Sequence, residues 1–334
     1  MKLNRIVLLA LCMLLILSLF AGCGAGGSTG ATGATTRPDV KGKSLSVVVT
    51  VFPAYDWARQ IIGDDNEQVA LTLLLDKGTD FHSYQPTVED LYTISTCDLF
   101  IYVGGESDKW VPDALAQASN PDMKALCLLD ALGGQAREEE LPEGAEAHEE
   151  EEEEGPAYDE HVWLSLRNAE TLCAAIRDLL TEADPEDASS YAANCKAYSE
   201  RLAALDRAYE EAVNAAARKT LLFADRFPFL YLAKDYGLNC FAAFSGCSAE
   251  SEASFETLNF LVNKVDELEL PCVMKIESST SRLAETVVSN SKAQNAQILE
   301  LNSLQSVTAQ GVADGVTYLG VMEENLEVLK QALN

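Results

Sequence analysis

Three histidines, His82, His148 and His161, are the side chains of this sequence best suited to binding a transition metal. Neutral imidazole is a good ligand for divalent transition metals, and a carboxylate that hydrogen-bonds the second ring nitrogen holds the ring in place. Such carboxylates stand beside two of the histidines: Asp80 near His82, and Asp159 and Glu160 near His161. No short ligand motif such as H-E-x-x-H is present. Spacing alone therefore leaves two interpretations open, a metal site shared by His82 and His161 or two loop histidines that face solvent.

The elements around these histidines predict how they come together. Short apolar runs rich in β-branched residues alternate with helical patterns, which predicts parallel sheets covered by helices. Loops that leave the carboxyl ends of parallel strands converge on one crevice, and we expect both histidines in such loops. The first half is predicted to form strands at Leu45–Val51, Val69–Leu75, Leu99–Val103 and Ala125–Leu129 and helices at Ala54–Ile62, Val88–Ser95 and near 168–180.

The same alternation returns in the second half of the chain, with strands predicted at Thr220–Phe223, Phe241–Phe244, Cys272–Ile276 and Ile298–Leu301 and helices at Phe255–Leu268, Ser281–Ser289 and Val312–Leu333. Between the two series, Asp187–Arg218 holds neither Gly nor Pro and would span about 48 Å as one helix. We predict an α/β fold of two small lobes, residues 44–186 and 219–334, with parallel sheets covered by helices and joined by one long rigid helix over 187–218. The alternative is a single doubly wound sheet.

The chain of 334 residues is strongly acidic, with 53 Asp plus Glu against 24 Lys plus Arg and a formal net charge of −29. Phosphate backbones repel such a chain, which excludes nucleic acid as a partner. A hydrophobic content of 48% is enough for a packed core. Carboxylates are concentrated in residues 138–160, which hold no Lys or Arg and include the run Glu149–Glu154. We expect a surface loop there, and whether it feeds metal inward stays open.

The amino terminus predicts export and a lipid anchor. A positively charged start followed by the uncharged apolar stretch Ile6–Gly22 is typical of a secretory signal. Leu19–Cys23 resembles the lipobox of bacterial lipoproteins, whose cysteine is acylated; the alternative is an ordinary signal peptide with a chance cysteine. We expect residues 1–22 to be a lipoprotein signal peptide, Cys23 to carry lipid such as palmitate, and 23–43 to be a flexible tether. The protein would then lie outside the cytoplasm, anchored to the outer face of the cell membrane.

Of the nine cysteines, Cys12 lies in the signal and Cys23 is the anchor, so seven belong to the folded part. An odd number cannot all pair, and at least one thiol must stay free. No C-x-x-C pair occurs, so a redox motif or thiolate zinc knuckle is not indicated. A bridge between Cys240 and Cys247 is possible and cannot be deduced from the sequence.

Several segments resemble, in order, the metal-binding substrate-binding lipoproteins of ABC transporters, the family that captures zinc or manganese for import. Gly78–Pro86 is similar to the family's G-x-D-x-H-x-Y-x-P segment, and His161–Leu164 is similar to its H-V-W-L segment. Residues 49–57, 98–104 and 231–238 also match. The resemblance implies two lobes bridged by a long helix, a metal clamped between the lobes, and a charged loop at 138–160. It also implies that His82 and His161 are ligands from the first lobe, with Asp80 and Glu160 beside them.

The second lobe departs from the family pattern where further ligands are expected. Arg226 stands where the family places His or Glu, and a guanidinium has no lone pair to offer a metal. Asn302 stands where Asp is usual, and its amide oxygen is the weaker ligand. Two alternatives follow. Either Asp225 turns inward and binds the metal, or Arg226 pairs with Glu277 and leaves the metal to the first lobe and water.

These observations predict a receptor and not an enzyme. We expect a lipid-anchored monomer that binds a divalent metal, zinc first and manganese second, and delivers it to an ABC-type import permease. Two alternatives are weighed against this reading. One is a lipid-anchored metallohydrolase with Glu160 or Asp225 as general base, and the other is a surface adhesin without a transport role.

Overall fold

The computed structural model describes residues 44–64, 66–145, 157–248, 252–292 and 294–334. The expected signal peptide, the tether, the lipidation site Cys23 and residues 146–156 of the acidic loop, with His148, lie outside the described residues. Among the described residues, no helix is both long enough and apolar enough to cross a bilayer.

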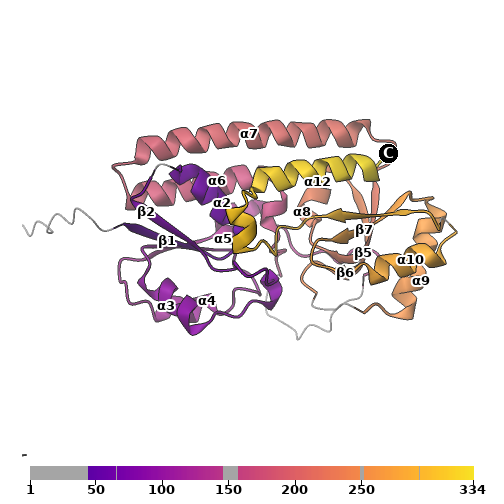
Figure 1. Ribbon diagram of the computed structural model, residues 1–334, viewed down its shortest axis with the longest axis horizontal. Helices are drawn as coiled ribbons and strands as arrows, with labels where there is room; N and C mark the ends of the chain where they lie inside the picture. Colours follow the sequence, from indigo (N-terminus) through magenta and orange to yellow (C-terminus); the bar gives the residue numbers. More distant parts are fainter. Residues whose placement is uncertain (1–43, 65, 146–156, 249–251, 293) are drawn as a thin grey trace, which may run out of the picture. The chain divides into compact units, whose positions relative to one another are not determined.

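The first sheet is entirely parallel, with strand order β2-β1-β3-β4 (Figure 1). Its strands and their surrounding helices alternate along the chain because short β-branched runs alternate with amphipathic segments. The elements are β1 (Leu45–Val49), α2 (Phe52–Ile62), β2 (Val69–Leu73), the 3₁₀ turn η1 (Phe81–Ser83), α3 (Val88–Thr96), β3 (Leu99–Tyr102), α4 (Val111–Ala116), β4 (Lys124–Cys127), α5 (Leu128–Leu132), the 3₁₀ turns η2 (Gly133–Gln135) and η3 (Val162–Leu164), and α6 (Leu166–Ala183).

The second sheet is also parallel, with order β6-β5-β7-β8. Its elements are β5 (Thr220–Phe227), α8 (Leu230–Tyr236), β6 (Asn239–Ser245), α9 (Phe255–Glu267), β7 (Cys272–Ile276), α10 (Arg282–Asn290), β8 (Gln297–Leu301), α11 (Ala309–Ala313) and α12 (Tyr318–Ala332). Two parallel sheets with surrounding helices confirm the expected two-lobe α/β fold and rule out the single doubly wound sheet.

One long helix, α7 (Ala188–Ala215), connects the two series of elements. Its 28 residues extend about 42 Å, and Figure 1 shows it running beside both sheets with α12 beneath it. It packs against α2 and α6 of the first lobe and against α8 and α12. The Tyr209 hydroxyl donates to the Met322 carbonyl at 2.6 Å, which ties α7 to α12. One long helix therefore joins the two lobes along the chain, as predicted, and α12 packs against it and against α2.

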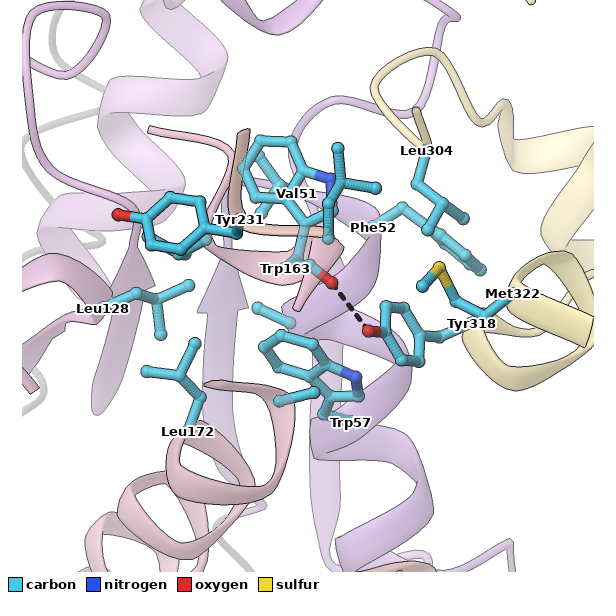
Figure 2. Packing of buried hydrophobic residues seen from close by; sticks show 14 of the residues in the cluster. Val51, Phe52, Trp57, Leu128, Trp163, Leu172, Tyr231, Leu304, Tyr318 and Met322 are labelled. Carbon is cyan, nitrogen blue, oxygen red and sulfur yellow. Dashed lines mark hydrogen bonds between the residues drawn. The ribbon is translucent and has the colours of Figure 1, made fainter. Parts of the chain in front are cut away.

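The core beneath the histidine segments draws side chains from both halves of the chain (Figure 2). The Tyr318 hydroxyl at the start of α12 donates to the Trp163 carbonyl at 2.6 Å, and its ring meets the edge of Trp57 at a centroid distance of 5.1 Å. The Trp163 indole donates to the Ser303 carbonyl at 2.8 Å. The rings of Trp57, Trp163 and Tyr318 are fully buried. Their packing and hydrogen bonds therefore fix the turn that carries His161.

Several sequence-based boundaries required correction, among them the following three. The predicted helix Val312–Leu333 is two helices, because Gly315 adopts a φ of 92° and Thr317 begins a new helix by accepting from the Gly320 amide. The predicted strand Ala125–Leu129 ends at Cys127, where α5 begins. The strand predicted at Thr220–Phe223 continues to Phe227.

Candidate metal centre

His82 lies in η1, immediately after the first sheet's edge strand β2 and its following turn. The Asp80 carboxylate caps this turn by accepting from the His82 amide at 3.1 Å. The ring Nδ1 lies 2.9 Å from the Ser107 hydroxyl and 3.2 Å from Glu160 Oε2. A carboxylate at Nδ1 fixes the proton there and leaves Nε2 as the free electron-pair donor.

Glu160 is itself held firmly. It accepts from the Ser107 amide at 2.7 Å and from the Ser107 hydroxyl at 2.5 Å. Gly105 has a φ of 80°, and a Cβ there would collide with the Glu160 carboxylate, so only glycine permits this approach. Burial by itself raises the pKa of Glu160, but His82 and Ser107 outweigh it and hold that pKa below its usual value.

His161 is fully buried and precedes η3, whose Val162, Trp163 and Leu164 are also fully buried. Its Nδ1 lies 3.1 Å from Asp159 Oδ1, and the same oxygen accepts from the His161 amide at 2.9 Å. The predicted role of carboxylates beside the rings is therefore divided: Glu160 faces His82 and Asp159 faces His161. Asp80 instead caps the turn that carries His82.

The two rings meet through their Nε2 atoms, which are 2.9 Å apart. With each Nδ1 facing a carboxylate, two electron-pair donors point at one another, an arrangement that is favourable only around a shared cation, either a proton or a metal ion. Two nitrogens on one tetrahedral zinc lie about 3.3 Å apart. Burial lowers the pKa of His82 more than Glu160 raises it, which favours the neutral ring that binds metal.

A third donor, Cys247, lies at the same place. The ligand atoms of His82, His161 and Cys247 all lie within 4.8 Å of one another. Cys247 follows the carboxyl end of β6 in the second lobe, so the same rule that placed the histidines could have found it. We did not predict it, because a cysteine outside a C-x-x-C pair gives no metal-binding signal by itself. All seven cysteines among the described residues are free thiols, including Cys240 and Cys247.

The structure does not bring Asp225 or Asn302 into this cluster. Asp225 Oδ2 accepts from the Ile276 amide at 3.0 Å and Oδ1 from the Arg226 amide at 2.8 Å, which ties β5 to β7. Asn302 Oδ1 accepts from the Leu304 amide at 2.8 Å. Both groups therefore satisfy backbone amides near strand ends, and the expectation that they face the metal is corrected.

Arg226 pairs with Asp80 and not, as the other alternative held, with Glu277. The Arg226 guanidinium lies 2.5 Å from Asp80 Oδ2 and 3.4 Å from Oδ1, joining the second lobe to the turn that carries His82. Burial by itself raises the pKa of Asp80, but this ion pair outweighs it and holds the pKa low. Glu277 instead accepts from the Ser303 amide at 2.7 Å and the Ser303 hydroxyl at 2.9 Å.

The first residues of the acidic segment also reach the cluster. Backbone bridges join Glu138 to Tyr158 and Glu143 to Phe241, so this segment lies along β6, the edge strand of the second sheet. The Cys247 amide and the Ser245 hydroxyl both act to lower the pKa of the Glu139 carboxylate. Its Oε1 is buried and has no hydrogen-bond partner among the described residues. Burial, and after it the charge of Asp159, raises the pKa of Glu139.

The comparisons with known proteins agree with this architecture. The family model for ZnuA, described as the periplasmic component A of the zinc-uptake complex, matches residues 47–332. The zinc-binding lipoprotein AdcA of Streptococcus pneumoniae is 33% identical over 291 residues, which cover 86% of this chain and 55% of AdcA. The high-affinity zinc uptake system protein ZnuA of Bacillus subtilis is 29% identical over 335 residues, covering 99% of this chain and 98% of that protein.

Among solved structures, the Zn(II)-bound ZnuA-like domain of S. pneumoniae AdcA aligns with a TM-score of 0.68 and 30% identity over 87% of this chain and 99% of that domain. The metal-dependent lipoprotein YcdH of B. subtilis aligns with a TM-score of 0.71 and 28% identity over 87% of this chain and 99% of its own. This chain spans about half the length of the first curated relatives that it matches. The extent of the family match, together with the two-lobe fold and the paired histidines, shows that the protein belongs to the ZnuA family of zinc-uptake components.

Proposed function

We propose that this protein is an extracytoplasmic, lipid-anchored receptor that binds zinc through His82 and His161 and delivers it to an ABC-type import permease. The observation that carries the proposal is the pair of Nε2 atoms 2.9 Å apart. Each ring has a carboxylate at its other nitrogen, Glu160 for His82 and Asp159 for His161, which is the usual support of a metal-binding histidine.

Zinc is proposed ahead of manganese because imidazole nitrogens suit zinc, whereas manganese prefers carboxylate, carbonyl and water oxygens. The names of the relatives, a zinc-binding lipoprotein and a zinc uptake protein, support the same choice. The family match favours uptake over the metallohydrolase alternative. Ester or peptide hydrolysis that is lost in His82→Ala would favour the enzyme instead.

The two-lobe fold suggests how a permease distinguishes the metal-bound protein from the metal-free one. We propose a first lobe of residues 44–186, the connecting helix at 187–218 and a second lobe at 219–334. A metal held by groups of both lobes stabilises their closed arrangement, which a permease can recognise. Because α7 and α12 both pack along the lobes, we expect small rotations between them, measurable as a change in small-angle scattering when zinc is added.

The direct test of the site is metal content and thermal unfolding of the wild type, His82→Ala and His161→Ala, with His148→Ala as a control imidazole. Ligand at 100 times its Kd stabilises a native protein by about 2.7 kcal/mol. We expect a zinc-dependent rise in Tm for the wild type and His148→Ala and none for the other two. An equal rise in all four variants would exclude the paired histidines as the site.

The anchor is tested separately. We propose that Cys23 carries the lipid, so Cys23→Ser is expected to move the protein from the membrane fraction to the soluble fraction of expressing cells. Unchanged membrane association of this variant would refute the lipid anchor and leave the metal site untouched.

A further inference from the structure

The second lobe of this protein needs a metal ligand that its family-like positions do not supply. Arg226 has no electron pair to donate and is paired with Asp80. The oxygens of Asp225 and Glu277 and the amide oxygen of Asn302 accept from backbone amides. Two other side chains, Cys247 and Glu139, lie near the histidines and can donate electron pairs to a metal.

Cys247 is held in the position that a ligand requires. Its sulfur shares a sphere of 4.8 Å with the two imidazole nitrogens. The preceding Gly246 packs on the His161 ring, because a Cβ there would lie 3.0 Å from His161 Cε1. That Cβ would also lie 2.9 Å from the Phe227 carbonyl oxygen, so the backbone here favours glycine, and Cys247 follows it directly.

Glu139 adds an oxygen donor beside that thiol. Its Oε1 is buried without a hydrogen-bond partner among the described residues. A buried carboxylate oxygen without a partner is costly, and coordination of a cation removes that cost. Glu139 lies outside the 4.8 Å group itself, so its coordination requires the side chain to rotate.

We propose that Cys247 supplies the second lobe's ligand and that Glu139 completes a four-donor centre with His82 and His161. This inference rests on the proposed receptor function and names the donors of the same site. Binding of Zn²⁺ forms the Zn–S bond while the thiol proton leaves to solvent. A thiolate with two imidazoles selects thiophilic ions such as zinc and disfavours manganese. Because Glu139 begins the acidic segment, metal binding also fixes the base of that segment against the second lobe.

Cobalt(II) in place of zinc tests the sulfur ligand directly, because thiolate coordination produces a ligand-to-metal charge-transfer absorption in the near ultraviolet. We expect this absorption in the wild type and in Cys240→Ser, a matched control in strand β6, and its loss in Cys247→Ser. Zinc affinity of Cys247→Ser should fall by more than about 100-fold, because loss of groups that only support a ligand already costs about 10–100-fold. Wild-type cobalt protein without the absorption, or Cys247→Ser with unchanged zinc affinity, would overturn the sulfur ligand.

The carboxylate is tested by Glu139→Gln against Glu138→Gln, the same change one residue earlier on an exposed side chain. Glu139→Gln should keep the charge-transfer absorption, alter the cobalt d–d bands and weaken zinc binding by about 10-fold or more. Identical d–d bands and zinc affinity in the two variants would exclude Glu139 as a ligand.

These outcomes separate the inference from the function on which it rests. If His82→Ala abolishes zinc binding and Cys247→Ser does not, the receptor stands and the sulfur ligand is wrong. If the wild type binds neither zinc nor cobalt, both the receptor and the donor set are wrong.

Discussion

The ion pair between Arg226 and Asp80 links the two lobes beside the paired histidines, and breaking it should destabilise the protein measurably. Their side chains are 14% and 17% exposed, and the guanidinium contacts both carboxylate oxygens. Arg226 also donates to the Ser248 carbonyl at 3.3 Å. The perturbation is Arg226→Met, which keeps the apolar stem and removes the charge, together with Asp80→Asn and the double variant.

The magnitude follows from the partial burial of the pair. Opposite charges about 4 Å apart attract by about 4 kcal/mol at an effective dielectric constant near 20. Desolvation offsets part of this attraction, so the net coupling should be about 1–3 kcal/mol. Arg226→Met alone should cost about 2–4 kcal/mol, because it leaves Asp80 charged and without its cation. The double variant should be closer to the wild type than the sum of the two single changes.

The assay is urea unfolding of the four proteins without metal, read by tryptophan fluorescence, with Arg207→Met as the control for loss of a helix-surface arginine on α7. The coupling free energy is the departure from additivity in the double-mutant cycle. A coupling below about 0.5 kcal/mol, within the range of exposed ion pairs, would refute the view that this contact holds the lobes together.

Three further changes test other contacts. Burial raises the pKa of Asp108 to about 7, so between pH 4 and 7 the folded state binds a proton that the unfolded state has lost. The free energy of unfolding of the wild type should therefore fall by up to about 4 kcal/mol as pH rises through this range. Asp108→Asn, denatured with urea at several pH values, should lack this slope, and an unchanged slope would contradict the raised pKa of Asp108. Glu160→Gln should weaken zinc binding by about 10–100-fold in calorimetry, because it loosens the hold on His82 Nδ1, and affinity equal to the wild type would show that this contact is dispensable. Tyr209→Phe removes the hydroxyl that donates to the Met322 carbonyl and should cost about 0.5–1.5 kcal/mol in urea, whereas no loss would mean that this link between α7 and α12 is not stabilising.

Local sequence was sufficient for much of the fold because the signals are short-range. Val88–Ser95 was predicted from its spacing and from Thr87, and the structure has a helix at Val88–Thr96 with a complete capping box between Thr87 and Asp90. Alternating strand and helix patterns likewise implied parallel sheets. The break in the last helix was missed, although Gly315 is visible in the sequence, because an isolated glycine is tolerated in many helices.

The first lobe's half of the site was also accessible from sequence. His82 and His161 stand in distinctive segments with carboxylates close along the chain, and Asp159 holds the ring of its near neighbour His161. Which carboxylate faces which ring could not be predicted from the sequence. Glu160 contacts His82, which is 78 positions away, whereas its neighbour Asp159 contacts His161, which is two positions away. Only the folded chain sets these distances.

The sequence by itself determined the lobes, the long connecting helix and the two imidazoles, since periodicity, capping and a contiguous motif are properties of neighbouring residues. The tertiary structure alone decided that Asp225 binds backbone amides, that Arg226 pairs with Asp80, and that Cys247 faces the histidines. The physical reason is competition. A buried acceptor turns to the strongest donor within reach, and which donors are within reach depends on segments that are distant in the chain and meet only when both lobes are folded.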